Sequence, residues 1–359
     1  MRRLVGLVRL ILAAVAVLVL IGLGAAGAGA IGIGPFARPL PASTLFVAIS
    51  RNDDETDARE IEVIDLAGGE RQVFTVDGRI TAMALSADRR SLYVAIDGPK
   101  LVLLDARTGT AFGRVDLEGS AVTQLVVGPD GRLYAIAVAA SGLTIAAIDV
   151  DEKRSGPALV MGLAGSAPGR PAPIGNGLLV PIADPRSLQL VRVTLQPFAL
   201  GERTEIFRSG GLPGAPAALA LGTGATAALA PFDAGARGAR LFVFTDPAER
   251  RERTLSFGSF GFTNPRGILD IQGQAAASTD GSAIQVCVGN SRSARRFSVA
   301  VTDLVATERG AECGQMTHGD GDTVLIATRG SPHLIVIDEH TGITRKSLAL
   351  AGIPTQLAR

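Results

Sequence analysis

The chain has 359 residues, of which 47% are hydrophobic and 19% are charged, and it contains 44 glycines and 19 prolines. This composition excludes a disordered chain, since the apolar content suffices for a core, and the abundance of turn-forming residues favours many short strands. The 35 basic and 34 acidic residues nearly cancel. Because proteins that bind nucleic acids normally carry a basic excess, no nucleic-acid partner is expected.

The N-terminus predicts export. Arg2, Arg3 and Arg9 precede an uncharged, mostly apolar run over residues 10–37. A positive start followed by such a run directs translocation and keeps the arginine side in the cytoplasm. The run is long enough to span a bilayer, which takes about 20 residues. The small residues at 26–30 would also suit a signal peptidase, so cleavage stays open.

These features predict three regions. Residues 1–36 form one hydrophobic helix, either a signal anchor or a signal peptide; residues 37–43 are a linker; and residues 44–359 fold as one domain. If the helix is kept, the protein is held at the bacterial inner membrane with its domain outside the cytoplasm. If the helix is cleaved, the protein is secreted or periplasmic.

A four-stranded unit organises the folded part. In its clearest copy, residues 80–96 hold two apolar runs around a polar turn, residues 100–110 hold a third run that ends in Thr-Gly, and residues 111–117 hold a fourth. Each run has strand length, and each break has turn chemistry. The unit is therefore expected to be a four-stranded antiparallel meander.

The unit recurs along the chain. The third strands are expected to end near Asp65, Asp105, Asp149, Thr194, Thr245, Asp303 and Asp338. The spacings of about 35 to 58 residues match the period of four-stranded β-propeller blades. Seven such ends predict seven blades. In blades four to six the pattern is degenerate, and the spacing places those strands more than the motif does.

The two ends of the folded part predict how the ring closes. Residues 44–50 match a second strand, so the first strand of that blade is missing, whereas residues 352–359 resemble the first strand at 78–85. We expect the C-terminal strand to complete blade one beside Leu45–Ser50. Such closure removes two open sheet edges, which would otherwise invite aggregation.

One family resemblance follows from these residues. Leu92-Tyr-Val-Ala-Ile96, then Leu101-Val-Leu-Leu-Asp105, then Thr108-Gly109 resembles the YVTN-type β-propeller repeat, although Ile96 stands where the repeat has Asn. The match is good in blades one, two, three and seven and poor between about residues 172 and 313. The resemblance implies an all-β, seven-bladed ring that is often exported. It implies no single activity, because one fold serves many functions.

The sequence predicts no catalytic residue, no metal site and no cofactor. The three histidines, His318, His333 and His340, fall in the last blade. His333 and His340 bracket one expected strand, which puts them about 23 Å apart. Metal-ligand and nucleophile motifs are missing. The acidic stretch at 52–57 lacks the spacing of a calcium loop and is expected to be a solvated turn.

The two cysteines, Cys287 and Cys313, leave two possibilities open. They could form a disulfide, which would fit an oxidising compartment outside the cytoplasm. They could equally be two small buried hydrophobic residues.

A basic arc is the candidate binding surface. Loops between second and third strands of blades five to seven are expected to carry Arg237, Arg292, Arg295, Arg296, Arg329 and His333. Arginine captures carboxylates and phosphates in bidentate geometry, so this arc could bind a protein or an anionic envelope component. The alternative is that these are ordinary solvated arginines on polar loops.

The sequence favours a non-enzymatic binding or assembly module outside the cytoplasm, tethered to the membrane, with its ligand or partner on the loop face around the central channel. A rigid ring with variable loops suits that role. The alternative is a small-molecule hydrolase of the propeller lactonase type, whose site residues form no compact motif. A transmembrane sensor is disfavoured, because only about nine residues precede the apolar run.

Overall fold

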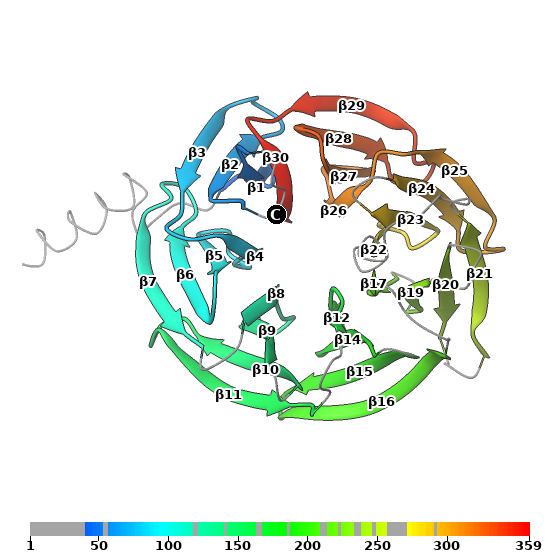
Figure 1. Cartoon of the computed structure of the whole chain (residues 1–359), viewed down its shortest axis with the longest axis horizontal. Helices are drawn as coiled ribbons and strands as arrows, with labels where there is room; N and C mark the ends of the chain where they lie inside the picture. The colour runs from blue at the N-terminus through cyan, green and yellow to red at the C-terminus, as the bar shows by residue number, and fades with distance from the viewer. Residues whose placement is uncertain are drawn as a thin grey trace, which may run out of the picture.

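The computed structural model of the chain is a closed ring of seven β-sheets around a central channel (Figure 1). The seven-bladed, all-β propeller expected from the sequence is confirmed. The structure describes residues 40–52, 57–117, 121–139, 142–162, 167–184, 187–208, 214–221, 224–232, 238–245, 249–256, 271–290 and 293–359.

In blades 2, 3 and 7 the strands follow chain order from the channel to the rim (Figure 1). Blade 2 consists of β4 (Ile80–Leu85), β5 (Ser91–Ile96), β6 (Lys100–Asp105) and β7 (Ala111–Asp116). Blade 3 consists of β8 (Ala121–Val127), β9 (Leu133–Ala139), β10 (Gly142–Asp149) and β11 (Arg154–Val160). Blade 7 consists of β26 (Gly314–His318), β27 (Thr323–Thr328), β28 (His333–Asp338) and β29 (Thr344–Ala349).

Blades 4 to 6 are the less regular ones. Blade 4 has a divided inner strand and consists of β12 (Ala167–Pro168), β13 (Ala172–Ile174), β14 (Gly177–Ala183), β15 (Ser187–Leu195) and β16 (Phe198–Arg208). Blade 5 consists of β18 (Ala217–Ala220), β19 (Thr226–Phe232), β20 (Gly238–Phe244) and β21 (Arg251–Ser256). Blade 6 consists of the short parallel strand β17 (Gly214–Ala215), β22 (Ile271–Ala277), β23 (Ala283–Asn290), β24 (Ser293–Ala300) and β25 (Ala306–Gly310).

Blade 1 joins the two ends of the folded part. It consists of β30 (Ile353–Ala358), β1 (Thr44–Ser50), β2 (Glu60–Asp65) and β3 (Arg71–Thr75). β1 pairs antiparallel with β30, in a register that runs from Phe46 opposite Ala358 to Ser50 opposite Ile353. The expected ring closure is therefore confirmed.

Polar contacts around the buried Glu62 strengthen this closure. The Glu62 side chain in β2 is 1% exposed. Its Oε2 accepts a hydrogen bond of 2.7 Å from the backbone N–H of Ala351, in the connection between β29 and β30. Arg71 Nη1 lies 3.1 Å from Glu62 Oε1 and donates to the Ala349 carbonyl at 2.6 Å. One carboxylate and one guanidinium thus tie blade 1 to the end of blade 7.

The Thr-Gly turns have a local cause. Asp105 Oδ1 accepts hydrogen bonds from the backbone N–H and the hydroxyl of Thr108, and Gly109 takes the positive φ of +70° that closes the turn. Asp338, Thr341 and Gly342 repeat the arrangement in blade 7. Matching residues therefore build matching turns in two blades.

The apolar core lies between neighbouring blades rather than at the centre of the ring. Between blades 1 and 2, for example, Phe46 and Phe74 pack with Met83 and Leu92. Because each blade presents apolar side chains to both neighbours, the ring buries its hydrophobic surface only when it is complete.

In the part of the chain that the structure describes, no helix has the length and apolarity that a membrane crossing requires. The helix expected over residues 1–36 lies outside the described residues, and the division into anchor, linker and domain stays a prediction.

Candidate functional site

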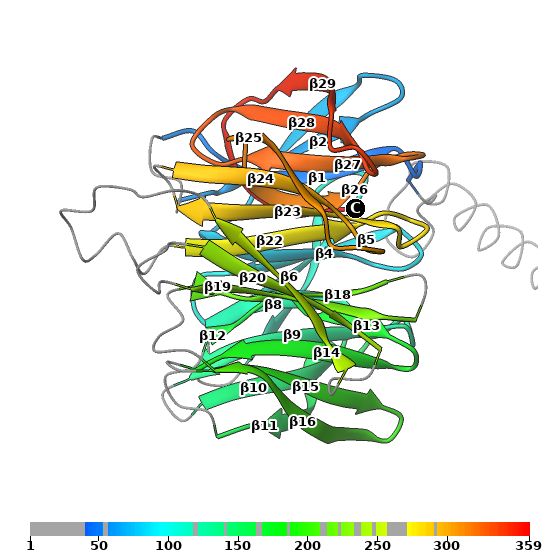
Figure 2. The ribbon, with the colours of Figure 1, turned by 90° about the vertical axis from the view of Figure 1, so that its right-hand side faces the viewer.

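The ring has two different faces, seen edge-on in Figure 2. One carries the turns between first and second strands, such as residues 86–90, 128–132 and 319–322, together with the C-terminal Arg359. We call it the turn face. The opposite face carries the loops between second and third strands and the blade-to-blade connections, and we call it the crossover face. The sequence placed the candidate binding surface on the crossover face.

Of the six predicted surface residues, Arg237 and Arg292 lie outside the described residues. Arg295 and Arg296 do not lie in a loop, because β24 already begins at Ser293. The Arg295 side chain is 35% exposed, and its Nε lies 3.0 Å from Glu308 Oε1.

Arg296 is a correction to the expected solvent-facing arc. Only 1% of the residue is exposed. Its guanidinium donates to the carbonyl of Gly342 and the hydroxyl of Thr344 in blade 7, and to the Arg309 carbonyl in its own blade. Burial lowers the pKa of this guanidinium, against the effect of Glu312. Arg296 therefore links blades 6 and 7.

Arg329 and His333 lie at the turn that precedes β28. Arg329 is half-buried, whereas His333 is exposed and its Nδ1 lies 2.8 Å from Ser331 Oγ. An anionic partner at Arg295, Arg329 and His333 stays a prediction.

Cys287 and Cys313 are joined by a disulfide, with their Cα atoms 5.4 Å apart. Cys287 belongs to β23, and Cys313 lies between β25 and β26. The bond therefore ties the second strand of blade 6 to the start of blade 7.

A cluster around Glu339 was not predicted from the sequence. His333 and His340 do lie at opposite ends of β28, as expected. However, His340 Nε2 and His318 Nδ1 lie 3.9 and 4.0 Å from the carboxylate of Glu339, which is 1% exposed. His340 Nε2 also lies 3.3 Å from Asp280 of blade 6. Among the described residues, no His, Cys, Asp and Glu group is arranged to hold a metal ion.

A cavity of about 330 Å³ occupies the turn-face half of the central channel. The inner strands β4, β8, β13, β22, β26 and β30 line it, together with the segment between β12 and β13. Its polar lining consists of Gln124, Arg170, Gln274, Gln315, Thr317, Gln356 and Arg359. We call it the channel cavity.

Arg170 occupies the channel because the inner strand of blade 4 is divided there. Gly169 lies so close to the Pro216 carbonyl that any Cβ would overlap it. The backbone of Arg170 then bridges in parallel to Ala217 of blade 5 instead of pairing with β14. Its Nη1 donates to the carbonyl of Met316 in β26. Blades 4 and 7 lie on different sides of the channel (Figure 1), so this hydrogen bond joins two blades that are not neighbours.

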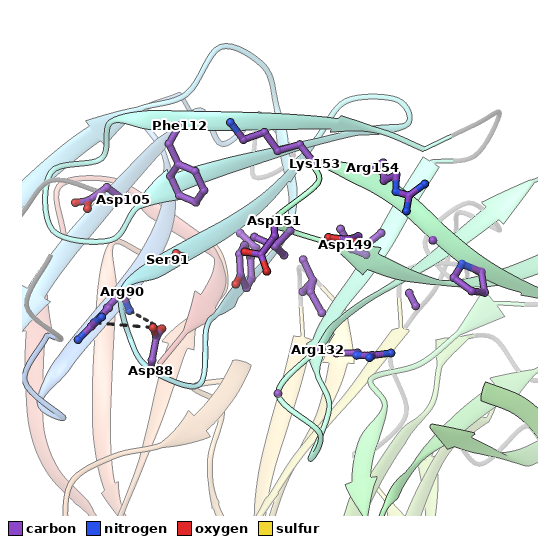
Figure 3. A pocket seen from close by; sticks show the side chains of 18 residues that line it. Asp88, Arg90, Ser91, Asp105, Phe112, Arg132, Asp149, Asp151, Lys153 and Arg154 are labelled. Atoms are coloured by element: carbon purple, nitrogen blue, oxygen red, sulfur yellow. Dashed lines mark hydrogen bonds and ion pairs between the residues drawn. The ribbon is translucent and has the colours of Figure 1, made fainter. Parts of the chain in front are cut away.

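A larger groove of about 920 Å³ lies between blades 2 and 3, also on the turn face (Figure 3). Its ionisable lining mixes both signs: Asp88, Arg90, Asp105, Arg132, Asp149, Asp151, Lys153 and Arg154. Burial raises the pKa of Tyr93 in this groove, and the carboxylates of Asp88 and Asp151 add to the effect. Because the charges are balanced, the groove favours neither anions nor cations.

No family model matches this chain, and no curated protein matches it in sequence. Its structure is similar to that of a Bacteroides fragilis protein provisionally named a 6-phosphogluconolactonase, with 14% identity and a TM-score of 0.62 over 88% of this chain and 96% of the other. Hydrazine synthase of Kuenenia stuttgartiensis gives 13% identity and a TM-score of 0.61 over 81% and 94%. BamB of Moraxella catarrhalis gives 14% and 0.52 over 89% and 86%.

At these identities the likeness shows the fold alone. The chain is a seven-bladed β-propeller, and the proteins it resembles have names from different functional classes.

Sequence reasoning missed the channel cavity for an identifiable reason. Arg170 lies in the stretch where the repeat is degenerate, and contacts with Pro216 and Met316, far away in the chain, position it. The only local signal is an arginine between Gly169 and Pro171, two residues that interrupt strands.

Proposed function

We propose that the protein is a non-enzymatic binding or assembly module that recognises its ligand or partner at the turn-face mouth of the channel. The proposal rests on two side-chain amides, those of Gln124 and Gln274, that line the channel cavity and have no hydrogen-bond partner among the described residues. Each amide offers two donors and a carbonyl acceptor, which a bound molecule would satisfy.

The fold supports the same role. A ring locked by β30 and by the Glu62–Arg71 contacts holds its inner strands in fixed positions. Rigid placement of polar groups lowers the entropy lost on binding, which favours recognition.

Native mass spectrometry of the full chain, purified in mild detergent from its own membranes, tests this proposal. We expect the wild type to carry a bound small molecule or partner, and the Gln124→Leu/Gln274→Leu variant to lose it. Gln72→Leu, on exposed β3, is the matched control and should retain it. An empty wild type, or equal retention by the double variant, would contradict the proposal. Lactone turnover by the wild type that the double variant loses would instead favour the small-molecule hydrolase.

We further propose that residues 1–36 hold this module at the inner membrane with the propeller outside the cytoplasm. The geometry of the first described residues supports a particular orientation. Arg89 Nη2 donates to the carbonyls of Pro41 and Thr44, each at 2.9 Å, and Arg359 Nε donates to the carbonyl of Ala42 at 3.1 Å. The domain therefore begins on the turn face, so an anchor would hold the channel mouth toward the membrane.

A fusion of alkaline phosphatase after Arg359 tests the location, because that enzyme is active only outside the cytoplasm, where its disulfides form. We expect activity in the membrane fraction. Activity confined to the soluble fraction would show cleavage, and an inactive fusion would contradict export.

A further inference from the structure

Arg170 lines the channel cavity with a positive charge, and no carboxylate of the described residues pairs with it. Among the described residues it has no ion pair, and the one hydrogen bond it donates ends on the carbonyl of Met316. Burial lowers the pKa of its guanidinium, and no carboxylate in the described part of the chain counteracts that effect. A guanidinium has five N–H donors, so most of this group's bonding capacity is unused.

Arg170 is half-buried, and an arginine enclosed in this way is normally paired with a carboxylate. Arg359, the other arginine of the channel cavity, illustrates this rule. Its Nη2 is paired with the carboxylate of Asp320, and its Nη1 donates to the His318 carbonyl at 2.7 Å. Arg170 differs, since the cavity itself is the space where a counterion would lie.

The neutral side chains around Arg170 suit an anion. Gln315 Nε2 donates to Gln356 Oε1 at 2.7 Å, and Gln315 Oε1 accepts from the backbone N–H of Leu357 at 3.0 Å, so this pair is fixed within the protein. The amides of Gln124 and Gln274 stay available as donors. None of the described lining residues is an aspartate or a glutamate.

Two arginines, Arg170 and Arg359, line the cavity, and the charges of both act on the nearby His318. Burial lowers the pKa of His318, and the charges of Arg170 and Arg359 add to this effect, whereas Glu339 opposes it. The volume of about 330 Å³ is at the lower end of the range for small-molecule sites. The cavity is therefore matched in charge and size to a small organic or inorganic anion.

We propose that the channel cavity binds a small molecule through an anionic group, a carboxylate or a phosphate, held by the guanidinium of Arg170. The planar guanidinium pairs with either group through two parallel N–H···O bonds. The amides of Gln124 and Gln274 add donors from blades 3 and 6. This inference rests on the proposed function of the channel cavity and specifies the class of its ligand.

The test uses the purified full chain in detergent, with inorganic phosphate and glutarate as separate probes and chloride at equal ionic strength as the reference. Calorimetric titration and the thermal midpoint are the readouts, because a ligand that binds only the folded state raises the midpoint. The variant is Arg170→Gln, and the control is Arg192→Gln, an exposed arginine of β15.

We expect phosphate, glutarate or both to bind the wild type and the Arg192→Gln control, and we expect Arg170→Gln to weaken that affinity by about 10-fold or more. The probe that binds identifies the anionic group. Without any probe, Arg170→Gln should unfold at the same temperature as the wild type, because Arg170 is half-buried and has no ion pair among the described residues.

Equal affinities of Arg170→Gln and the wild type for a probe would overturn the inference. It would also be overturned if the wild type gave the same heat of binding and the same thermal midpoint with both probes as with chloride. A purified chain that retains a neutral ligand regardless of Arg170 would refute the anionic class but leave the binding function intact. Loss of the probe response together with a lower midpoint in chloride would show a structural role and would also overturn it.

Discussion

Arg295 and Arg296 are neighbours in β24, and the alternation of a strand sends their side chains into two different environments. Arg295 forms a part-exposed ion pair with Glu308, whereas Arg296 is buried at the boundary of blades 6 and 7 and donates to backbone carbonyls there. The cost of losing each side chain should differ accordingly.

We expect Arg296→Ala to lower the free energy of unfolding by about 3 kcal/mol, because it leaves buried carbonyls without a donor. Arg295→Ala should cost less than about 1 kcal/mol, as is usual for exposed ion pairs. Urea unfolding of both variants measures the difference. Equal losses would mean that Arg296 does not link the blades in solution.

His318 provides a test by pH. Its pKa is lowered in the folded protein, chiefly by burial, so the unfolded chain binds a proton first as the pH falls. Stability should therefore be highest above about pH 6.5, the unfolded pKa, and should decrease as the pH drops below it.

We expect the thermal midpoint of His318→Gln to decline less between pH 7 and pH 5 than that of the wild type. His333→Gln is the control, because the His333 ring has one hydrogen bond among the described residues, to Ser331 Oγ, and does not lie beside Glu339 as His318 does. Since the His318 side chain is 53% exposed, the expected difference is small. A parallel decline in wild type and His318→Gln would contradict the prediction.

At the scale of strands and turns, some features depend on neighbouring residues in the sequence and others depend on contacts between blades. The Thr-Gly turns of blades 2 and 7 were predictable, since Asp, Thr and Gly build each turn from their own hydrogen bonds and φ angles. The divided inner strand of blade 4 was not, because the contact of Gly169 with Pro216 joins residues of different blades. The channel cavity depends on that division.

The same distinction explains the misplaced arginines. The loops of blades 6 and 7 were located from the spacing of the repeat, and such a position carries an error of a few residues. Arg296 is only the fourth residue of β24, so an error of that size moves it from the predicted loop into the strand. The third strand that the sequence placed near Asp303 also ends earlier, at Ala300. Burial at a blade boundary depends on the neighbouring blade, which no local pattern reports.

Two glycines, Gly98 and Gly109, both have a positive φ, so a comparison of them separates the cost of side-chain packing from the cost of the backbone conformation. Gly98 and Gly109 have φ values of +78° and +70°, but a Cβ on Gly98 would meet nothing, whereas one on Gly109 would overlap the ring of Phe74 in blade 1. We expect Gly98→Ala to cost about 1 kcal/mol from φ alone, and Gly109→Ala to cost at least about 1 kcal/mol more. Urea unfolding checks this, and equal costs would show that the turn does not pack on blade 1.

At the scale of the whole molecule, the chain closes on itself through one short strand. The pairing of β30 with β1 was predictable because both ends of the folded part carried incomplete copies of a repeat. The shape of the channel interior was not predictable, since the inner strands of different blades, far apart in the sequence, form it together.

We expect a chain that ends at Gly352 to lose cooperative unfolding and to aggregate, because β1 would present an open edge. A synthetic peptide with the sequence of residues 353–359, added during refolding, should restore a monomeric, cooperatively unfolding ring. Size-exclusion chromatography and circular dichroism follow both effects. A truncated chain that remains monomeric and unfolds like the wild type would show that closure contributes little.

Closure by β30 also sets the order of assembly. Blade 1 contains the first described strand and the last, so the blade begun earliest during synthesis is the last to be completed. Until Ile353–Ala358 have been made, the inner edge of Phe46–Ser50 has no partner, and chains at this stage are exposed to mispairing. A chaperone that covers the edge of β1 until Ile353–Ala358 have been made would therefore reduce mispairing.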